Sequence, residues 1–216
     1  MKKNSIIILD NGHGLETLGK RSPDGVFREY RWCRDFVKLL KSKLEYWGYK
    51  VIELVPEEED ISLTARANRA NEIYKLHNNC ILISIHNNGA GDGSKWYNTT
   101  GWEAWTSPGN TRSDRLAEIL YEEAELKGLK TRKDLSDLDA DKEANFTILT
   151  KTKCPAVLTE NMFMDSKKDL EFLNSEDGVK TLIDIHLNAV RRYFEDLDGT
   201  HDSWRSNAQI NKCNLK

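Results

Sequence analysis

The sequence predicts an α/β fold, with a single domain whose largely parallel, twisted sheet of about six strands carries helices on both faces. Residues Cys80 to Ile85 form a short, isoleucine-rich run with hardly a polar atom, which is typical of a strand buried on both faces of a parallel sheet. A second run of the same kind covers Ile6 to Leu9. Apolar residues recur at helical spacing between the strand patterns, and this alternation favours a doubly wound sheet.

Each element follows from its own local pattern. The first helix carries apolar residues at helical spacing from Cys33 to Trp47, and Gly48 suits the position just after a helix end. Ser62 is placed to cap the second helix. We expect strands at residues 6–10, 49–55, 80–85, 102–106, 146–149 and 156–159, helices at 33–47, 62–76, 111–127, 166–173 and 177–194, and loops at 87–100 and 131–143.

Composition limits the class of protein. The chain has 216 residues, of which 38% are hydrophobic, enough for one sizeable core and hence one domain. The formal net charge of −3 implies no strongly basic face, so we expect no nucleic-acid partner. No apolar stretch reaches transmembrane length, so we expect no membrane insertion. Separately, we expect the protein to be a monomer. The four cysteines show no C-x-x-C spacing and are expected to be reduced.

The start of the chain does not resemble an export signal. Lys2 and Lys3 precede an apolar run that reaches only Leu9 before Asp10, which is too short for the core of a signal peptide. We therefore expect a protein that is made in the cytoplasm without a signal peptide of its own.

Polar side chains with metal-binding chemistry follow three of the predicted strands. His13 and His86 each stand where an apolar strand ends, Glu160 ends another strand, and Glu29 opens the first helix. The carboxyl ends of parallel strands share one edge of a sheet, where ligands bind in α/β folds. Two histidines and one carboxylate around an open position are typical of catalytic zinc, with a further carboxylate to move the proton. Glu29 as an ordinary first-turn acid and Glu160 as a solvated strand end stay open as alternatives.

The order and local sequence of these groups resemble the zinc-dependent N-acetylmuramoyl-L-alanine amidases, the family that includes bacterial cell-separation amidases and phage endolysins. The resemblance covers about residues 5–195 and rests on Asp10–Gly14, Phe27–Glu29, Ser84–Asn88 and Pro155–Phe163, with support from Leu63-x-x-Arg66, Ala70-Asn71 and Gly101-x-Glu103. The sequence departs from the family pattern at Asn11, where proline is usual, and at Asn87, where a small residue is common.

The resemblance implies specific roles for four residues. By position, His13, Glu29 and His86 would bind Zn²⁺, and Glu160 would be the catalytic general base and acid. The implied substrate is peptidoglycan, cut at the amide bond between N-acetylmuramic acid and L-alanine. The implied catalytic domain spans residues 1–196, followed by a polar tail at 197–216. An enzyme of this kind acts on the cell wall, and a phage-encoded form would be released through a holin.

Two other functions stay open at the level of sequence. A zinc peptidase that cuts wall peptides would use the same groups, so the site alone does not separate it from an amidase. A wall-binding module without catalysis is the alternative that needs no enzyme, although such a module has no need of Glu160.

Two further expectations concern regulation and the core. The stretches 87–100 and 131–143 lack an apolar face, so we expect neither to form a helix that blocks the site, and we expect activity without a partner. His186 lies on the apolar stripe of the last predicted helix and is expected to be a buried histidine with a hydrogen-bond partner.

Overall fold

Six strands form one sheet in the order β2-β1-β3-β6-β4-β5 in the computed structural model, which describes residues 5–136 and 139–197. The strands are β1 Ile6–Asn11, β2 Lys50–Glu53, β3 Cys80–Asn88, β4 Glu103–Thr106, β5 Lys142–Glu143 and β6 Ala156–Phe163. Neighbouring strands are parallel except β4 and β6, which are antiparallel. The predicted fold class, a largely parallel sheet of about six strands, is therefore confirmed.

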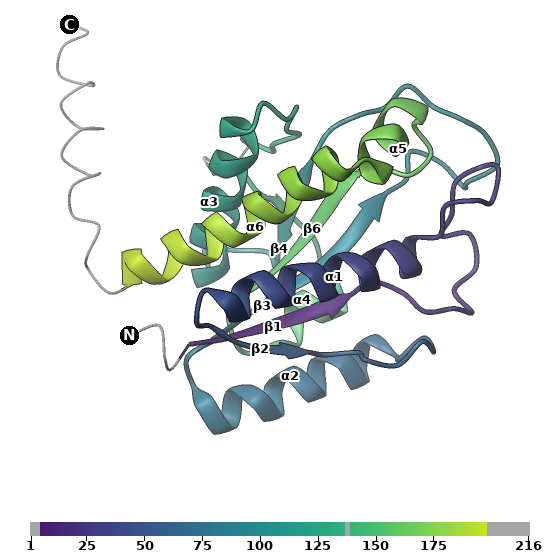
Figure 1. Cartoon of the computed structure of the whole chain (residues 1–216). Coiled ribbons are helices and arrows are strands. Elements are labelled where there is room, and N and C mark those ends of the chain that lie inside the picture. Colours follow the sequence, from purple (N-terminus) through teal and green to yellow (C-terminus); the bar gives the residue numbers. More distant parts are fainter. Residues whose placement is uncertain (1–4, 137–138, 198–216) are drawn as a thin grey trace, which may run out of the picture.

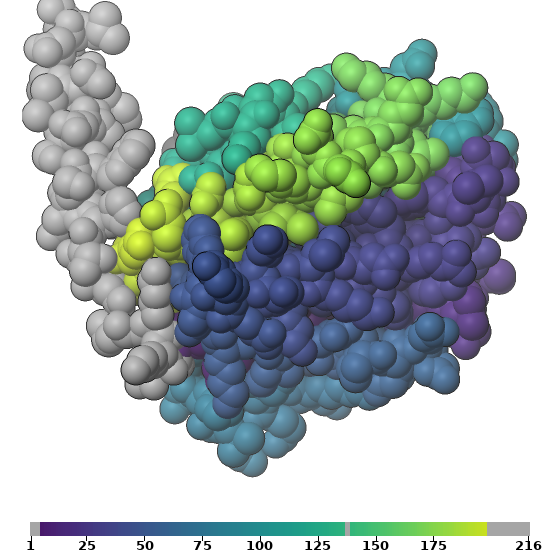
Figure 2. Space-filling view, in the orientation of Figure 1, coloured from purple at the N-terminus to yellow at the C-terminus, as the bar shows by residue number. Residues whose placement is uncertain are grey.

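Helices cover both faces of the sheet (Figure 1). They are α1 Glu29–Tyr46, α2 Leu63–His77, α3 Arg112–Leu126, α4 Thr147–Thr150, α5 Lys167–Asn174 and α6 Glu176–Leu197. Apolar residues of α1, α3 and α6 form the larger core on one face, and those of α2 and α4 form the smaller core on the other. Figure 2 shows α1 and α6 side by side across the first face.

The alternation of side chains along β1 explains why its sequence is apolar throughout. Ile7 and Leu9 belong to the larger core, whereas Ile6 and Ile8 belong to the smaller one. A central strand with a core on each side must be apolar at every position. The expected helix cap is also present, since the Ser62 hydroxyl accepts a hydrogen bond from the backbone N–H of Ala65 at 3.3 Å.

The predicted strand at 146–149 is wrong. Residues Thr147–Thr150 form one turn of helix, α4, whose Ile148 and Leu149 are buried in the smaller core. A four-residue apolar run fits a buried helical turn as well as a strand, because its length shows neither period. The edge position next to β4 is instead taken by β5, two residues inside the predicted loop 131–143.

Two predicted strand ends are also wrong, and both lie at the candidate site. β3 continues to Asn88 and β6 continues to Phe163, so His86 and Glu160 lie within strands and not just beyond them. The pairing becomes irregular between His86 and Asn88, and Met162 adopts a left-handed φ of 65°. Irregular pairing of this kind re-aims side chains at a sheet edge, and it leaves little signal in the sequence.

Several smaller expectations can be placed on the structure. Cys33, Cys80 and Cys154 are buried and free, as expected, whereas Cys213 and the tail at 198–216 lie outside the described residues. Neither 87–100 nor the described part of 131–143 forms a helix. Among the described residues, no helix is both long and apolar enough to cross a membrane.

Candidate metal centre

Three of the four predicted site residues meet at the carboxyl edge of the sheet. Their nitrogen and carboxylate oxygen atoms, from His13, Glu29 and His86, all lie within 4.8 Å of one another. Glu29 Oε1 is 3.4 Å from His13 Nε2 and 3.1 Å from His86 Nδ1. The two imidazole rings stand at 89° to each other, with centroids 4.9 Å apart.

The chain after β1 holds His13 in an unusual backbone conformation. His13 has a φ of 63°, which non-glycine residues rarely adopt. The preceding Gly12 has no room for a side chain, because a Cβ there would lie 2.5 Å from the His86 ring. The carbonyl oxygen of His13 accepts hydrogen bonds from Arg34 Nη1 and Arg66 Nη2, each at 3.1 Å. Two guanidinium groups thus fix a strained residue whose side chain faces the site.

A buried ion pair lies directly beneath the two histidines. Arg66 is 1% exposed, and its Nη1 donates to Asp10 Oδ1 at 2.7 Å and to the carbonyl oxygen of Asn11 at 2.6 Å. The second oxygen of Asp10 accepts from the Ser84 hydroxyl at 2.5 Å. These contacts link α2 to the end of β1 and, through Asp10, to the middle of β3. The ion pair therefore helps the backbone hydrogen bonds to hold these two strands in register.

Glu29 is buried at the first position of α1, where the helix dipole favours a negative charge. Its Oε1 accepts a hydrogen bond from the backbone N–H of Asn87 at 3.0 Å. Its Oε2 is buried and has no hydrogen-bond partner among the described residues. An ionised carboxylate with one unused buried oxygen is a suitable ligand for a cation, because it leaves a lone pair free.

The electrostatics of the three residues also fit a cation. Burial alone would raise the pKa of Glu29, but the hydrogen bonds and charges of His13 and His86 hold its pKa well below its usual range. Burial lowers the pKa of His13, which favours the neutral imidazole that a metal needs. Burial also lowers the pKa of His86, but Glu29 outweighs this effect and raises it. The buried carboxylate therefore requires a positive neighbour, either a proton on His86 or a cation.

Two imidazoles and one carboxylate with space for a further ligand match the donor set of catalytic zinc. Zn²⁺ takes nitrogen and oxygen ligands at about 2.0–2.2 Å, so the three groups need only a small approach to share one ion. The residues present thus fit the metal that the sequence predicts.

Glu160 lies beside this trio on the neighbouring strand. It pairs with His86 in the β3–β6 register, and on its other side it pairs with Glu103 of β4. Its Oε2 is buried without a hydrogen-bond partner among the described residues. Burial raises the pKa of Glu160 to about 8, and the negative charges of Glu29 and Glu103 act in the same direction while His86 opposes it. A cation bound by the neighbouring trio would lower this pKa again, because positive charge favours the ionised form.

A buried hydrogen-bonded chain connects the site to α6. His186 is fully buried, as predicted, and its ring nitrogens contact the carbonyl oxygen of Leu182 at 2.7 Å and the Thr159 hydroxyl at 3.1 Å. Asn161 Nδ2 donates to the Thr159 hydroxyl and to the carbonyl oxygen of His86, each at 3.1 Å. This series of hydrogen bonds between side chains therefore reaches the backbone of His86, a candidate ligand.

Asn161 and Arg34 support the site from behind, and neither was predicted from the sequence. Asn161 directly follows Glu160, and its Oδ1 accepts from Trp102 Nε1 at 2.9 Å. Arg34 stands on the buried side of α1, where a charged residue among apolar neighbours was the available signal. The departure at Asn87 has a clear role, since its backbone N–H holds Glu29 and its side chain donates to the Asn161 carbonyl oxygen at 2.8 Å.

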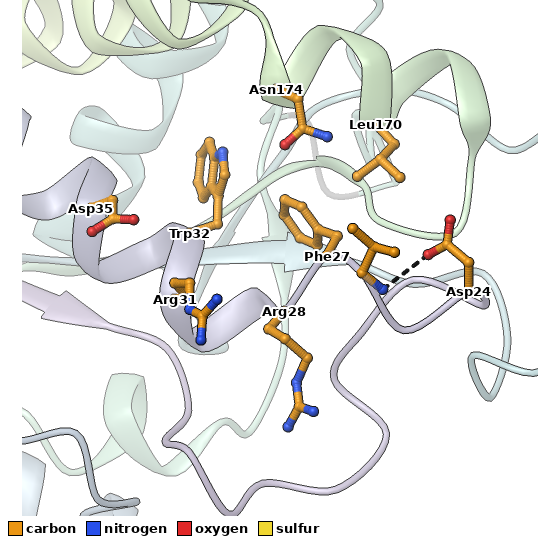
Figure 3. Close-up of a pocket in the computed structure, with 9 residues that line it drawn as sticks. Asp24, Phe27, Arg28, Arg31, Trp32, Asp35, Leu170 and Asn174 are labelled. Carbon is orange, nitrogen blue, oxygen red and sulfur yellow. Dashed lines mark hydrogen bonds between the residues drawn. The ribbon is translucent and has the colours of Figure 1, made fainter.

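A pocket of about 370 Å³ lies beside the start of α1. Figure 3 shows Phe27 and Trp32 with Leu170 and Asn174 of α5 above them. Arg28, which also lines this pocket, directly precedes Glu29. None of the four candidate residues lines it, so the pocket is a neighbour of the candidate centre and not part of it.

Comparisons with known proteins agree with this geometry. The family described as N-acetylmuramoyl-L-alanine amidase matches residues 7–192. An N-acetylmuramoyl-L-alanine amidase of Bacillus licheniformis is 30% identical over 190 residues, which cover 87% of this chain and 68% of that protein. An endolysin of Bacillus phage SPP1 is 27% identical over 191 residues, which cover 87% of this chain and 65% of the endolysin. The chain thus spans about two thirds of the length of these two relatives.

A solved structure shares the fold. The N-acetylmuramoyl-L-alanine amidase of Clostridium difficile 630 superposes with a TM-score of 0.78 at 24% identity, over 89% of this chain and 98% of that one. The family match covers nearly the whole sheet and all four candidate residues. The chain therefore belongs to the N-acetylmuramoyl-L-alanine amidase family, the amidases of bacterial peptidoglycan.

Proposed function

We propose that this protein is a zinc-dependent hydrolase that cuts the amide bond between N-acetylmuramic acid and L-alanine in peptidoglycan. The observation that carries the proposal is the convergence of His13, Glu29 and His86, with Glu160 in register beside them. Zinc held by these three side chains would supply a Lewis acid that polarises the amide carbonyl and makes water more acidic.

Glu160 moves the proton in this mechanism. Its carboxylate accepts a proton from the water whose oxygen adds to the carbonyl carbon of the lactyl group. It then gives the proton to the nitrogen of L-alanine as the carbon–nitrogen bond breaks. The products are a lactyl carboxylic acid and a peptide with a free amine. The unpartnered Oε2 of Glu160 supports this role, because no described residue competes for it.

Glu29 and His86 have different tasks from Glu160. The bond between Glu29 Oε1 and the Asn87 N–H fixes the orientation of the Glu29 carboxylate before a cation arrives. The Asn161 contact to the His86 carbonyl oxygen does the same for the strand that carries His86. Positions fixed in advance lower the cost of assembling the site.

The two alternatives differ in measurable ways. A zinc peptidase would create new termini between two amino acids of the stem peptide. The proposed enzyme instead releases the stem peptide with a free amine on its L-alanine and leaves a carboxylic acid on the lactyl group of muramic acid. Mass spectrometry of purified muropeptides after incubation separates the two. A wall-binding module without catalysis would release nothing from dye-labelled peptidoglycan with or without a chelator.

The central test is a pair of variants. Glu160→Gln keeps the shape of the side chain but cannot accept a proton, so we expect full zinc content and native fold with dye release reduced by at least about a hundredfold. His13→Ala removes a ligand and should lose both zinc and activity. Zinc analysis and dye release are measured on both proteins. Lysis by Glu160→Gln at close to the parent rate contradicts the mechanism, and undiminished zinc after His13→Ala contradicts the ligand assignment.

We also propose that residues 1–196 form the catalytic unit and that it works without an activator. The absence of helix in 87–100 and in the described part of 131–143 supports this, because no such helix covers the candidate centre. Dye release by the purified protein alone tests it, and activity only after addition of a second protein contradicts it.

A further inference from the structure

The row of paired residues that contains His86 and Glu160 continues onto β4. Glu160 pairs with His86 on one side and with Glu103 on the other, so the three side chains occupy one face of three adjacent strands. Adjacent strands lie about 4.8 Å apart, so Glu103 stands about 10 Å from the His86 strand across the sheet. Glu103 is thus at the end of the candidate site that faces away from the metal.

Glu103 is buried, and its carboxylate accepts hydrogen bonds from two cationic side chains. Its Oε1 accepts from Arg132 Nε at 2.5 Å and from Lys142 Nζ at 3.0 Å. Its Oε2 accepts from Asn88 Nδ2 at 3.0 Å and from Trp105 Nε1 at 3.1 Å. All four bonds fix the carboxylate, and the group of Glu103, Arg132 and Lys142, here called the Glu103 cluster, has one positive charge in excess.

Arg132 is fixed but only partly used. Its aliphatic stem packs against Gly101, where an added Cβ would lie 2.8 Å from Arg132 Cγ, and its guanidinium lies 5.3 Å from the centre of the Phe163 ring. The side chain is nevertheless 37% exposed, and Nη1 and Nη2 donate to no side chain or carbonyl among the described residues. A guanidinium held through Nε with both terminal nitrogens free is arranged to bind a carboxylate.

We propose that the Glu103 cluster, through Arg132, binds the free α-carboxylate of the second stem-peptide residue, D-glutamate, while the muramoyl–alanine amide lies over Glu160. The inference rests on the proposed function, because that function places the scissile bond. One alanine residue separates the scissile nitrogen from D-glutamate, so the carboxylate lies about 6 Å from that nitrogen in an extended peptide. This distance is close to the spacing of about 4.8 Å between β6, which carries Glu160, and β4, which carries Glu103.

The assignment predicts a preference for the charged form of the substrate. A free carboxylate gains a charge-assisted pair with Arg132, whereas an amidated residue, isoglutamine, leaves the excess positive charge unmatched. Glu103 keeps the cluster from attracting anions too strongly, since it neutralises one of the two cations. The Lys142 side chain is 20% exposed. It lies on the same side of the site and offers the substrate carboxylate a second, weaker contact.

The test compares two muropeptides that differ only in this group, one with free D-glutamate and one with isoglutamine. In Arg132→Gln, kcat/KM for the free acid should fall about tenfold or more, mainly through KM, because a bond to a charged group is lost. The fall for the isoglutamine substrate should be less than about threefold. Lys133→Gln is the matched control, since Lys133 is the next residue but pairs with Glu125 at 2.7 Å.

A second measurement separates this inference from the proposed function. The product peptides that begin L-alanyl-γ-D-glutamate and L-alanyl-D-isoglutamine are titrated calorimetrically into the zinc-loaded parent protein and into Arg132→Gln. The parent should bind the free acid more tightly, and Arg132→Gln should lose that preference. Equal effects of Arg132→Gln on both substrates and both peptides would overturn the inference. If the parent cuts neither muropeptide, the proposed function fails, and the peptide preference still decides the role of Arg132.

Discussion

His186 should make the free energy of unfolding depend on pH. Burial lowers the pKa of His186 to about 4, against an ordinary value of 6.5, and the hydrogen bond to Leu182 only partly opposes this. Between these values the unfolded chain binds a proton that the folded chain refuses, so folding loses stability as the pH falls. The contribution is complete above pH 6.5 and is lost progressively down to pH 4. Each pKa unit corresponds to about 1.4 kcal/mol, so the total loss is about 3 kcal/mol.

The assay must separate this histidine from the carboxylates that titrate in the same range. We compare the parent protein with His186→Gln, which keeps a polar side chain but does not titrate. Urea unfolding followed by tryptophan fluorescence is measured from pH 7 to pH 4, with a chelator present throughout so that metal release does not contribute. The difference in unfolding free energy between the two proteins should change by about 3 kcal/mol across this range, to the disadvantage of the parent in acid.

A matched control and a refuting result complete the design. His77→Gln is the matched control, because it removes a histidine that is exposed on α2 and belongs to neither core. A constant difference between the parent and His186→Gln from pH 7 to pH 4 would show that His186 takes up its proton freely in the folded protein. The reasoning from its burial would then be wrong.

Two further variants test the support of the candidate centre. Arg66→Met leaves the buried Asp10 charge unpaired and should lower the free energy of unfolding, measured in urea, by about 3–5 kcal/mol. Part of this loss should be recovered in the double variant Arg66→Met/Asp10→Asn. A loss of less than about 1 kcal/mol would contradict the stabilising role of the ion pair. Gly12→Ala places a methyl group against the His86 ring and should reduce zinc content more than it lowers Tm. The control is Gly109→Ala, which strains a backbone with φ of 92° but meets no atom within 4 Å, so it should lower Tm without reducing zinc content; equal zinc content in both refutes the steric argument.

The fold was accessible from sequence because it rests on local signals, and the three converging residues were singled out by the family resemblance. The apolar runs that become β1 and β3 show their burial directly, and His13 and His86 interrupt them with polar groups. The short helix at Thr147–Thr150 was not accessible, because one turn has no period. The ends of β3 and β6 depend on pairing between strands, which the sequence of either strand does not contain.

The supporting groups show the same limit more clearly. Arg34, Asn161 and Arg132 act through contacts to residues at least 21 positions away along the chain. Nothing in the immediate sequence of Asn161 or Arg132 distinguishes them from other polar residues, and Arg34 is marked only by its place among the apolar residues of α1. Glu103 was noticed in sequence only as part of the family resemblance, and its two cationic partners emerge only in three dimensions.

The position of β6 in the sheet has a consequence for when, during synthesis, the candidate site is completed. Among the strands of the described residues, Ala156–Phe163 is the last to leave the ribosome, yet it lies between β3 and β4 in the middle of the sheet. Until it is inserted, β3 and β4 have no neighbour at that place, and Glu160 is not beside His86. Domains are completed during synthesis only when their last element emerges, at about 5–20 residues per second. A chain truncated before β6 would therefore carry the three candidate ligands without Glu160 beside them, and under the proposed function it would not lyse walls.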